Sequence, residues 1–195
     1  WVENMAIRYS TLLVVLLAVG LLALRTADAQ SVDTPATHAL MIDAMTGAVL
    51  LEKNADVPMP PASMSKLMTA YLIFERLKSG ALNPDDRFTV SRKAWAKGGS
   101  KMFLRQGQRV SLESLIRGIV IQSGNDACIV LAEGLAGSEE AFAEIMNAKA
   151  KELGLKDSHF TNATGWPHPD HYMTARDLAT LAQRIIEDFP EYYHF

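Results

Sequence analysis

The sequence of 195 residues is long enough for one domain of ordinary size. Apolar residues make up 49% and charged residues 21%, a composition that is typical of a folded globular protein and excludes a disordered chain. The formal net charge is -3 and no basic block is present, so we expect no nucleic-acid partner. Cys128 is the single cysteine, which excludes a disulfide within the chain.

The first residues have the layout of a secretory signal peptide. A positive charge precedes an apolar run at residues 12–24, and the small-x-small triplet Ala-Asp-Ala ends at Ala29. The apolar run is shorter than the roughly 20 residues that a helix needs to cross a bilayer. The alternative is an N-terminal anchor that is not cleaved. We expect residues 1–29 to be a signal peptide cleaved after Ala29, which leaves one domain at residues 30–195.

The chain that follows begins with strand patterns and continues with a helix. Residues 38–43 and 48–51 are short apolar stretches with a Met-Thr-Gly turn signal between them, so they predict a β-hairpin. A loop with three prolines comes next. From Ser63 the apolar spacing becomes helical. The predicted apolar face consists of Leu67, Tyr71, Phe74 and Leu77, and Gly80 ends this helix as a C-cap.

The rest of the sequence predicts mainly helices. Residues 83–110 are polar and contain several glycines, which favours loops with short strands. Four further helices are expected at about residues 112–121, 126–135, 139–153 and 175–188. Capping residues precede three of them, namely Ser111, Ser138 and Thr174, and Asp177 completes a capping-box pattern with Thr174. Because strands come first and helices dominate afterwards, the expected fold class is α+β.

Ser63 and Lys66 form the first candidate site. They stand three positions apart in the sequence Ser-Met-Ser-Lys, so they share one face of the predicted helix. A serine hydroxyl is a weak nucleophile unless a base takes its proton, and lysine can do so when burial lowers its pKa toward about 7–8. Free amides at the helix N-terminus suit a developing oxyanion. The alternative is an ordinary capping serine beside a solvated lysine, because Ser-x-x-Lys alone is a common sequence.

Ser123, Gly124 and Asn125 form the second candidate site. They lie 60 residues after Ser63, in a polar break between two apolar helical stretches. Side chains in such a break can point into a cleft. A second serine can pass a proton between Lys66 and a leaving amine, and an asparagine amide can orient a substrate through its donor and acceptor groups. By itself, Ser-Gly-Asn is also a common turn.

In this order and spacing, the two motifs resemble the superfamily of penicillin-binding proteins and serine β-lactamases. The wider match resembles the low-molecular-mass D-alanyl-D-alanine carboxypeptidases, peptidase S11, and covers about residues 36–193. The segments that carry it are Asp43 to Gly47, Pro61 to Thr69, Ile116 to Gly118, Gln122 to Ala127 and Leu153 to Gly165. The resemblance implies a β-lactamase/transpeptidase-like fold, in which an antiparallel sheet is flanked by helices and joined by a helical subdomain.

The resemblance also implies a role for each candidate residue. Ser63 attacks the carbonyl of the penultimate D-alanine and forms an acyl-enzyme, with Lys66 as general base. Ser123 relays the proton to the departing D-alanine, and Asn125 and Gly124 bind the substrate. The implied partners are the peptidoglycan stem peptide and β-lactam antibiotics, which acylate the same serine. The family needs no cofactor.

The histidine-rich run at residues 168–171 is a candidate metal site. His168, Asp170 and His171 offer three possible ligands, but Pro169 breaks any helical ligand spacing. We expect no metal to bind there.

The third motif of the family, Lys-Thr-Gly or Lys-Ser-Gly, is expected beyond Phe195. The run Lys-Ser-Gly ending at Gly80 has the right letters, but it precedes Ser123 and reads as a helix end. We therefore expect residues 30–195 to be a serine peptidase domain that is incomplete at its C-terminus and inactive alone.

The resemblance implies export to the periplasm or to the outer face of the cytoplasmic membrane. It also implies that the full-length protein is attached there by a C-terminal helix.

Three other functions stay open on the same sequence. A serine β-lactamase of the commonest form uses the glutamate of Glu-x-x-Leu-Asn, a sequence that is not found at Glu133, Glu139, Glu140, Glu144 or Glu152. An endopeptidase that cuts cross-links is poorly separated from a carboxypeptidase by these motifs. A non-catalytic sensor that recognises penicillin would not need Ser63 and Lys66 to be intact.

Overall fold

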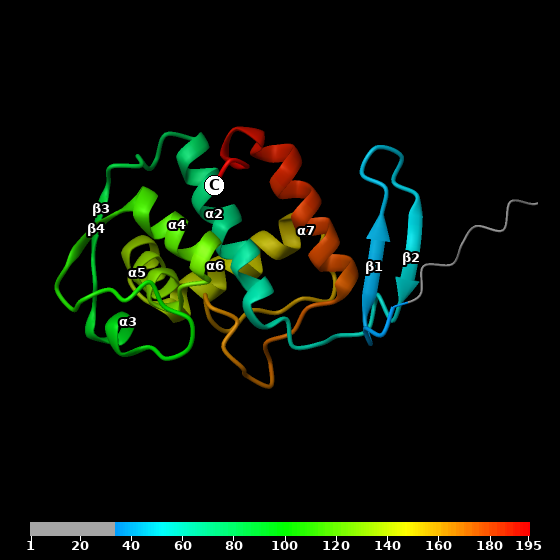
Figure 1. Ribbon diagram of the computed structural model, residues 1–195, viewed down its shortest axis with the longest axis horizontal. Helices are drawn as coiled ribbons and strands as arrows, with labels where there is room; N and C mark the ends of the chain where they lie inside the picture. The colour runs from blue at the N-terminus through cyan, green and yellow to red at the C-terminus, as the bar shows by residue number, and fades with distance from the viewer. Residues whose placement is uncertain (1–33) are drawn as a thin grey trace, which may run out of the picture. The chain divides into compact units, whose positions relative to one another are not determined.

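The computed structural model describes residues 34–195 (Figure 1). The expected signal peptide at residues 1–29 lies outside the described residues. The elements are β1 (Ala39–Ile42), β2 (Val49–Lys53), η1 (Ala62–Ser65), α2 (Lys66–Lys78), β3 (Arg87–Thr89), α3 (Arg92–Ala96), β4 (Arg109–Ser111), α4 (Leu112–Gln122), α5 (Asn125–Ala136), α6 (Glu139–Glu152), α7 (Ala175–Asp188) and η2 (Pro190–Tyr192). Two short antiparallel sheets and a body of helices confirm the predicted α+β class.

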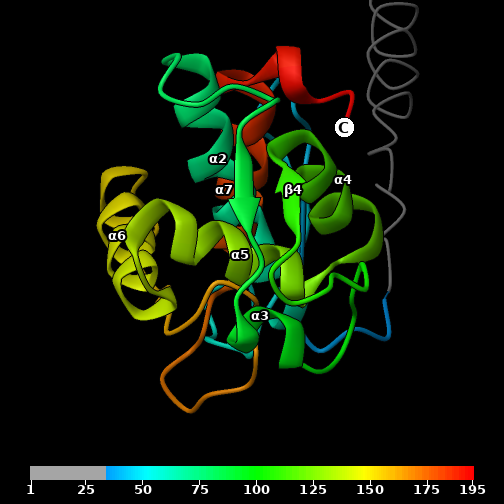
Figure 2. The same ribbon diagram turned by 90° about the vertical axis from the view of Figure 1, so that its left-hand side faces the viewer.

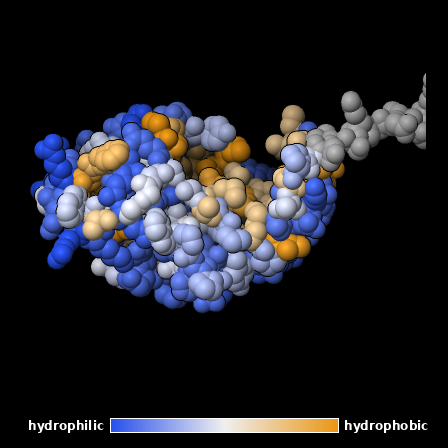
Figure 3. Space-filling view, turned by 60° about the horizontal axis from the view of Figure 1, so that its bottom comes forward, coloured by the Kyte–Doolittle hydropathy of each residue, from blue (hydrophilic) through white to orange (hydrophobic). Residues whose placement is uncertain are grey.

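β1 and β2 form the predicted hairpin. They pair antiparallel, with Ala39 opposite Lys53. Asp43 holds the turn, because its carboxylate accepts hydrogen bonds from the backbone N–H and the hydroxyl of Thr46, each over 2.7 Å. Within residues 34–195 each strand has a single partner strand. The hairpin exposes apolar side chains (Figure 3), among them Met41, Val49 and Leu50.

A second small sheet pairs β3 with β4, with Arg87 opposite Ser111. The predicted loops and short strands of this region are present, but the prediction misses α3, which lies between the two strands. Ser91 begins α3, since its hydroxyl accepts a hydrogen bond from Ala94 N over 3.0 Å. A helix of five residues is shorter than the stretch over which apolar periodicity can be recognised.

The helical body is arranged around α5, which lies between α4 and α6 (Figure 2). Every residue of α5 from Asn125 to Ala132 is buried. Full burial of a Leu, Ile or Val side chain contributes ~1.5–3 kcal/mol, so α5 is strongly held in place. The polar residues at its N-terminus are held in place with it.

Among residues 34–195, no helix is both long enough and apolar enough to span a bilayer.

The three predicted helix caps are present. Ser111, Ser138 and Thr174 begin α4, α6 and α7, and each side-chain oxygen accepts a backbone N–H three residues further on. The second half of the predicted capping box is not formed. The carboxylate of Asp177 instead accepts hydrogen bonds from the chain that leads away from α6, at Lys156 N, Asp157 N and Ser158 Oγ. This buried carboxylate therefore joins the start of α7 to that segment.

The chain between α6 and α7 passes against the helix tip formed by η1. Gly165 has a φ of +77°, and a Cβ atom added there would lie 1.8 Å from the carbonyl oxygen of Ala62. The two backbones are in direct contact, with no room for a side chain between them. Gly165 thereby allows this loop to approach the helix tip that carries Ser63.

We predict that Gly165→Ala destabilises the protein by well over the ~1–2 kcal/mol that a left-handed conformation costs an ordinary residue. The reason is that the methyl group would meet backbone atoms, which cannot rotate away. Gly80→Ala is the matched control, because Gly80 has a φ of +74° with nothing within 4 Å of the added Cβ. Urea unfolding of both variants measures the difference. Equal losses of stability would contradict the close contact.

Candidate active site

Ser63 and Lys66 meet at the tip of α2. Ser63 lies in the 3-10 turn η1, and Lys66 is the first residue of α2. Lys66 Nζ donates a hydrogen bond to Ser63 Oγ over 2.9 Å. The expected placement of both side chains on one face is therefore confirmed. A hydroxyl and an amine at this distance can exchange a proton.

Lys66 is buried, with 5% of its surface exposed. Its Nζ also donates to the carbonyl oxygen of Thr164 over 2.8 Å. Burial lowers the pKa of Lys66 below its ordinary value, because the charged form loses its hydration. A thiolate at Cys128 would oppose this effect, but burial raises the pKa of that thiol to about 12. The thiol is therefore neutral near pH 7, and the lowering effect of burial dominates.

Ser123 lies on the same cavity as Ser63 and Lys66. The cavity has a volume of about 370 Å³, and its walls are otherwise mostly apolar, with Leu67, Ile119 and Val120 among them. Ser123 ends α4 in a left-handed conformation, with a φ of +54°. Its hydroxyl is buried and has no hydrogen-bond partner among the described residues. A buried polar group without a partner is uncommon, which makes this hydroxyl a candidate contact for a ligand.

Asn125 begins α5 and bonds to the loop at residues 98–100. Its side-chain Nδ2 donates to the carbonyl oxygen of Gly98 over 2.9 Å, and its backbone N–H donates to Ser100 over 2.8 Å. Asn125 and Gly124 are not among the residues that line the cavity beside Ser63. Trp166 packs against the same loop at Gly98. The roles of Asn125 and Gly124 in substrate binding stay predictions.

Asp126 is a positioning residue that the sequence analysis missed. It is almost fully buried, at 1% exposure. Its Oδ1 accepts a hydrogen bond from Met102 N over 3.0 Å, and its Oδ2 accepts one from Leu104 N over 3.1 Å. Together with the Asn125 contacts, these bonds fasten residues 98–104 over the turn between α4 and α5. The available signal was an aspartate in the first turn of a helix, directly before the apolar run at residues 127–132.

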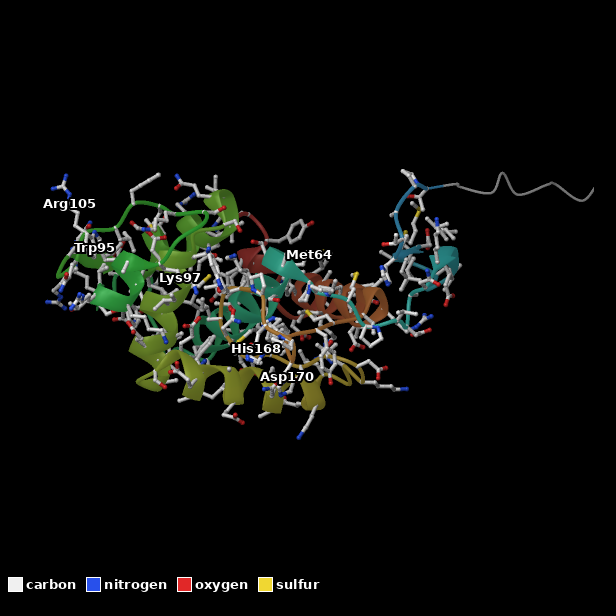
Figure 4. The ribbon with its side chains drawn as sticks, turned by 90° about the horizontal axis from the view of Figure 1, so that it is seen from below. Met64, Trp95, Lys97, Arg105, His168 and Asp170 are labelled. Atoms are coloured by element: carbon white, nitrogen blue, oxygen red, sulfur yellow. The ribbon has the colours of Figure 1, made fainter. Side chains whose placement is uncertain are left out.

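The histidines of the 168–171 run point in different directions. His171 is buried at 3% exposure, and its Nε2 lies 2.7 Å from Ser65 Oγ. The side chain of His168 is 49% exposed and lies 3.8 Å from the carboxylate of Asp170 on the same loop (Figure 4). In the described part of the chain, no three metal-binding side chains converge.

A family model described as D-alanyl-D-alanine carboxypeptidase, peptidase S11, matches residues 25–195. The chain belongs to this family. It is 43% identical over 175 residues to the D-alanyl-D-alanine carboxypeptidase DacC of Escherichia coli, a match that covers 87% of this chain and 43% of that protein. A more distant relative is the D-alanyl-D-alanine endopeptidase of Pseudomonas aeruginosa, which is 33% identical over 144 residues and covers 73% of this chain and 45% of that protein.

Solved structures of family members share the fold. The carboxypeptidase DacD of Francisella tularensis matches with a TM-score of 0.81 and 40% identity, over 84% of this chain and 40% of that one. Penicillin-binding protein 5 of Haemophilus influenzae matches with a TM-score of 0.77 and 38% identity, over 82% of this chain and 48% of that one. These matches confirm the β-lactamase/transpeptidase-like fold. This family member spans less than half the length of the proteins reported above.

We predict that Asp126→Asn loosens residues 98–104 and lowers the free energy of unfolding by ~1–3 kcal/mol. The amide replaces one acceptor oxygen by a donor, which then faces a buried backbone N–H. Asp85→Asn is the matched control, because Asp85 is an exposed loop residue. Hydrogen exchange at Met102 and Leu104 locates the change. Unaltered protection at both amides in Asp126→Asn would contradict the fastening role.

Proposed function

We propose that this chain carries the nucleophile and general base of a serine-type D-alanyl-D-alanine carboxypeptidase. The enzyme removes the terminal D-alanine from peptidoglycan pentapeptides and is a target of β-lactam antibiotics. One observation carries the proposal. The buried amine of Lys66 lies 2.9 Å from the hydroxyl of Ser63, on a cavity that Ser123 also lines.

Acylation begins with Ser63. In its neutral form Lys66 has a lone pair, which accepts the hydroxyl proton of Ser63 across their short contact. The oxygen of Ser63 then attacks the carbonyl carbon of the penultimate D-alanine. The position of Ser63 in the first turn of a helix supports a backbone N–H as one donor to the oxyanion.

The second half of acylation needs a proton on the departing amine. Ser123 passes the proton from Lys66 to the nitrogen of the terminal D-alanine, and the carbon–nitrogen bond breaks. The buried hydroxyl of Ser123, which has no partner in residues 34–195, supports this relay. Asn125 and Gly124 hold the peptide beside it. Water then attacks the ester of Ser63, with Lys66 again as base, and releases the shortened peptide.

A serine β-lactamase is the first alternative, and it requires fast hydrolysis of the penicilloyl ester. Among residues 34–195, Glu139 is the buried glutamate, but its carboxylate accepts the N–H of Ala163 over 3.3 Å and pairs with Lys93 over 3.0 Å. With these partners it is poorly placed to activate water. We therefore expect a long-lived penicilloyl-enzyme.

An endopeptidase is the second alternative. The higher identity to a carboxypeptidase, 43% against 33%, favours removal of a terminal D-alanine over cutting of cross-links. A non-catalytic sensor is the third, and the direct contact of Ser63 with Lys66 favours catalysis over recognition alone.

Export belongs to the same proposal, because peptidoglycan lies outside the cytoplasmic membrane. We place the protein in the periplasm or at the outer face of that membrane, after removal of residues 1–29. The domain that acts there begins at residue 30.

The test of the function uses the complete gene product. We expect fluorescent penicillin to label it stoichiometrically, and we expect release of D-alanine from a D-alanyl-D-alanine pentapeptide but not cleavage of a cross-linked dimer. Ser63→Ala should abolish labelling and peptidase activity, because no nucleophile remains. Ser79→Ala, a serine at the other end of α2, is the matched control and should retain both. Peptidase activity that survives in Ser63→Ala would refute the proposal.

The acylation rate should depend on pH through Lys66. Only the neutral amine can act as base, so the rate should rise with pH through the lowered pKa of Lys66 and level off above it. Lys66→Arg should abolish acylation at every pH tested, because the guanidinium group stays charged and cannot act as a base. Lys101→Gln is the control, since that amine bonds to the carbonyl of Trp95 instead. A flat profile for the unmodified enzyme would contradict the role of Lys66.

The exported protein should begin at Gln30. The small side chains of the triplet that ends at Ala29 fit signal-peptide cleavage. N-terminal sequencing of protein recovered from the envelope measures the start. A sequence that retains residues 12–24 would instead indicate an N-terminal anchor.

A further inference from the structure

Ser65 and His171 form a buried polar pair directly behind the candidate site. Ser65 lies in η1 between Ser63 and Lys66, and it is fully buried. His171 comes from the loop before α7, 106 residues further along the chain, and is 3% exposed. The distance from Ser65 Oγ to His171 Nε2 is 2.7 Å. None of the proposed chemical steps uses either side chain.

The neighbours of His171 fix the direction of this hydrogen bond. Thr161 N donates to His171 Nδ1 over 3.1 Å, so Nδ1 carries a lone pair. The ring proton is then on Nε2 and is donated to Ser65 Oγ. Burial is the main cause that lowers the pKa of His171 to about 4, and the nearby His159 and His168 lower it further. His171 is therefore a neutral donor near pH 7.

The same loop reaches α2 at two further points. The carbonyl of Thr164 accepts a hydrogen bond from Lys66 Nζ over 2.8 Å, and the carbonyl of Ala163 accepts one from Thr69 Oγ1 over 2.8 Å. Both carbonyls belong to the segment that begins at Thr161, whose N–H bonds to His171. The His171 ring thus touches the backbone of this loop and the helix tip at once.

We propose that His171 is a positioning residue for the acylation step. Through Ser65 it sets the separation between the helix tip that carries Ser63 and the loop carbonyl that holds Lys66. This inference rests on the proposed function and adds a residue to it. A role in packing alone would not require a polar pair, since an apolar pair of similar volume avoids the cost of desolvation. Ser65 stands between Ser63 and Lys66 in the sequence, so its bond to His171 acts on the turn that carries both, which favours positioning.

The test measures the two stages of penicillin acylation separately in the complete gene product, by rapid mixing with fluorescent penicillin. We expect Ser65→Ala and His171→Phe to slow the chemical step about 10–100-fold while the affinity of the first, noncovalent complex stays within about twofold. His171→Gln, whose amide can donate to Ser65, should recover most of the rate. The double variant Ser65→Ala/His171→Phe should be no slower than the slower single variant, because both remove the same link.

A control variant and a folding measurement test the positioning role of His171 separately from the proposed function. His168→Gln changes an exposed histidine of the same loop and should acylate at the unmodified rate. Thermal unfolding identifies any variant that fails to fold. If His171→Phe does not fold, the acylation rate of Ser65→Ala, which removes one oxygen atom, is the test of the positioning role. A folded Ser65→Ala variant with an unchanged chemical step would overturn the positioning role. Absence of labelling in the unmodified protein would instead overturn the proposed function.

Discussion

A buried lysine amine is the constraint on which the rest of the structure depends. An ammonium ion inside a protein is costly unless it is paired, and the groups that contact Lys66 are a hydroxyl and a carbonyl. Because these acceptors are neutral, they do not offset the effect of burial, which lowers the pKa of Lys66. A carboxylate partner would have had the opposite effect and would have kept the lysine charged. The environment of Lys66 therefore suits a base better than a structural cation.

Two loops that are far apart in the sequence are fastened by polar side chains, and the second of them contacts Lys66. Residues 98–104 are fastened by Asp126, and the loop before α7 is fastened by His171 and Asn162. Asn162 accepts hydrogen bonds from Thr164 N and from Trp166 N, which fixes the carbonyl that faces Lys66. Buried and partly buried polar side chains of this kind rigidify a loop, because each bond that breaks leaves an unpaired group.

The turn between α4 and α5 shows strain beside the site. Ser123 has a left-handed backbone, a conformation that costs an ordinary residue ~1–2 kcal/mol, and its hydroxyl has no partner within residues 34–195. Both features disfavour the folded state, and the extensive burial of α5 compensates for them. Strained residues with unsatisfied groups concentrate at functional sites. The turn is therefore a second observation, independent of the Ser63–Lys66 contact, that points to the same cavity.

The sequence by itself determined the local structure and the pairing of Ser63 with Lys66. Helix periodicity, the caps at Ser111 and Ser138 and the spacing of three residues are short-range effects, so they can be read from neighbouring residues. The prediction missed the short helix α3 because five residues are fewer than the stretch over which apolar periodicity can be recognised. Only the tertiary structure decided that Lys66 is buried, that Asp126 holds a loop and that His171 reaches Ser65. Those properties depend on contacts across as many as 106 residues, which no local pattern encodes.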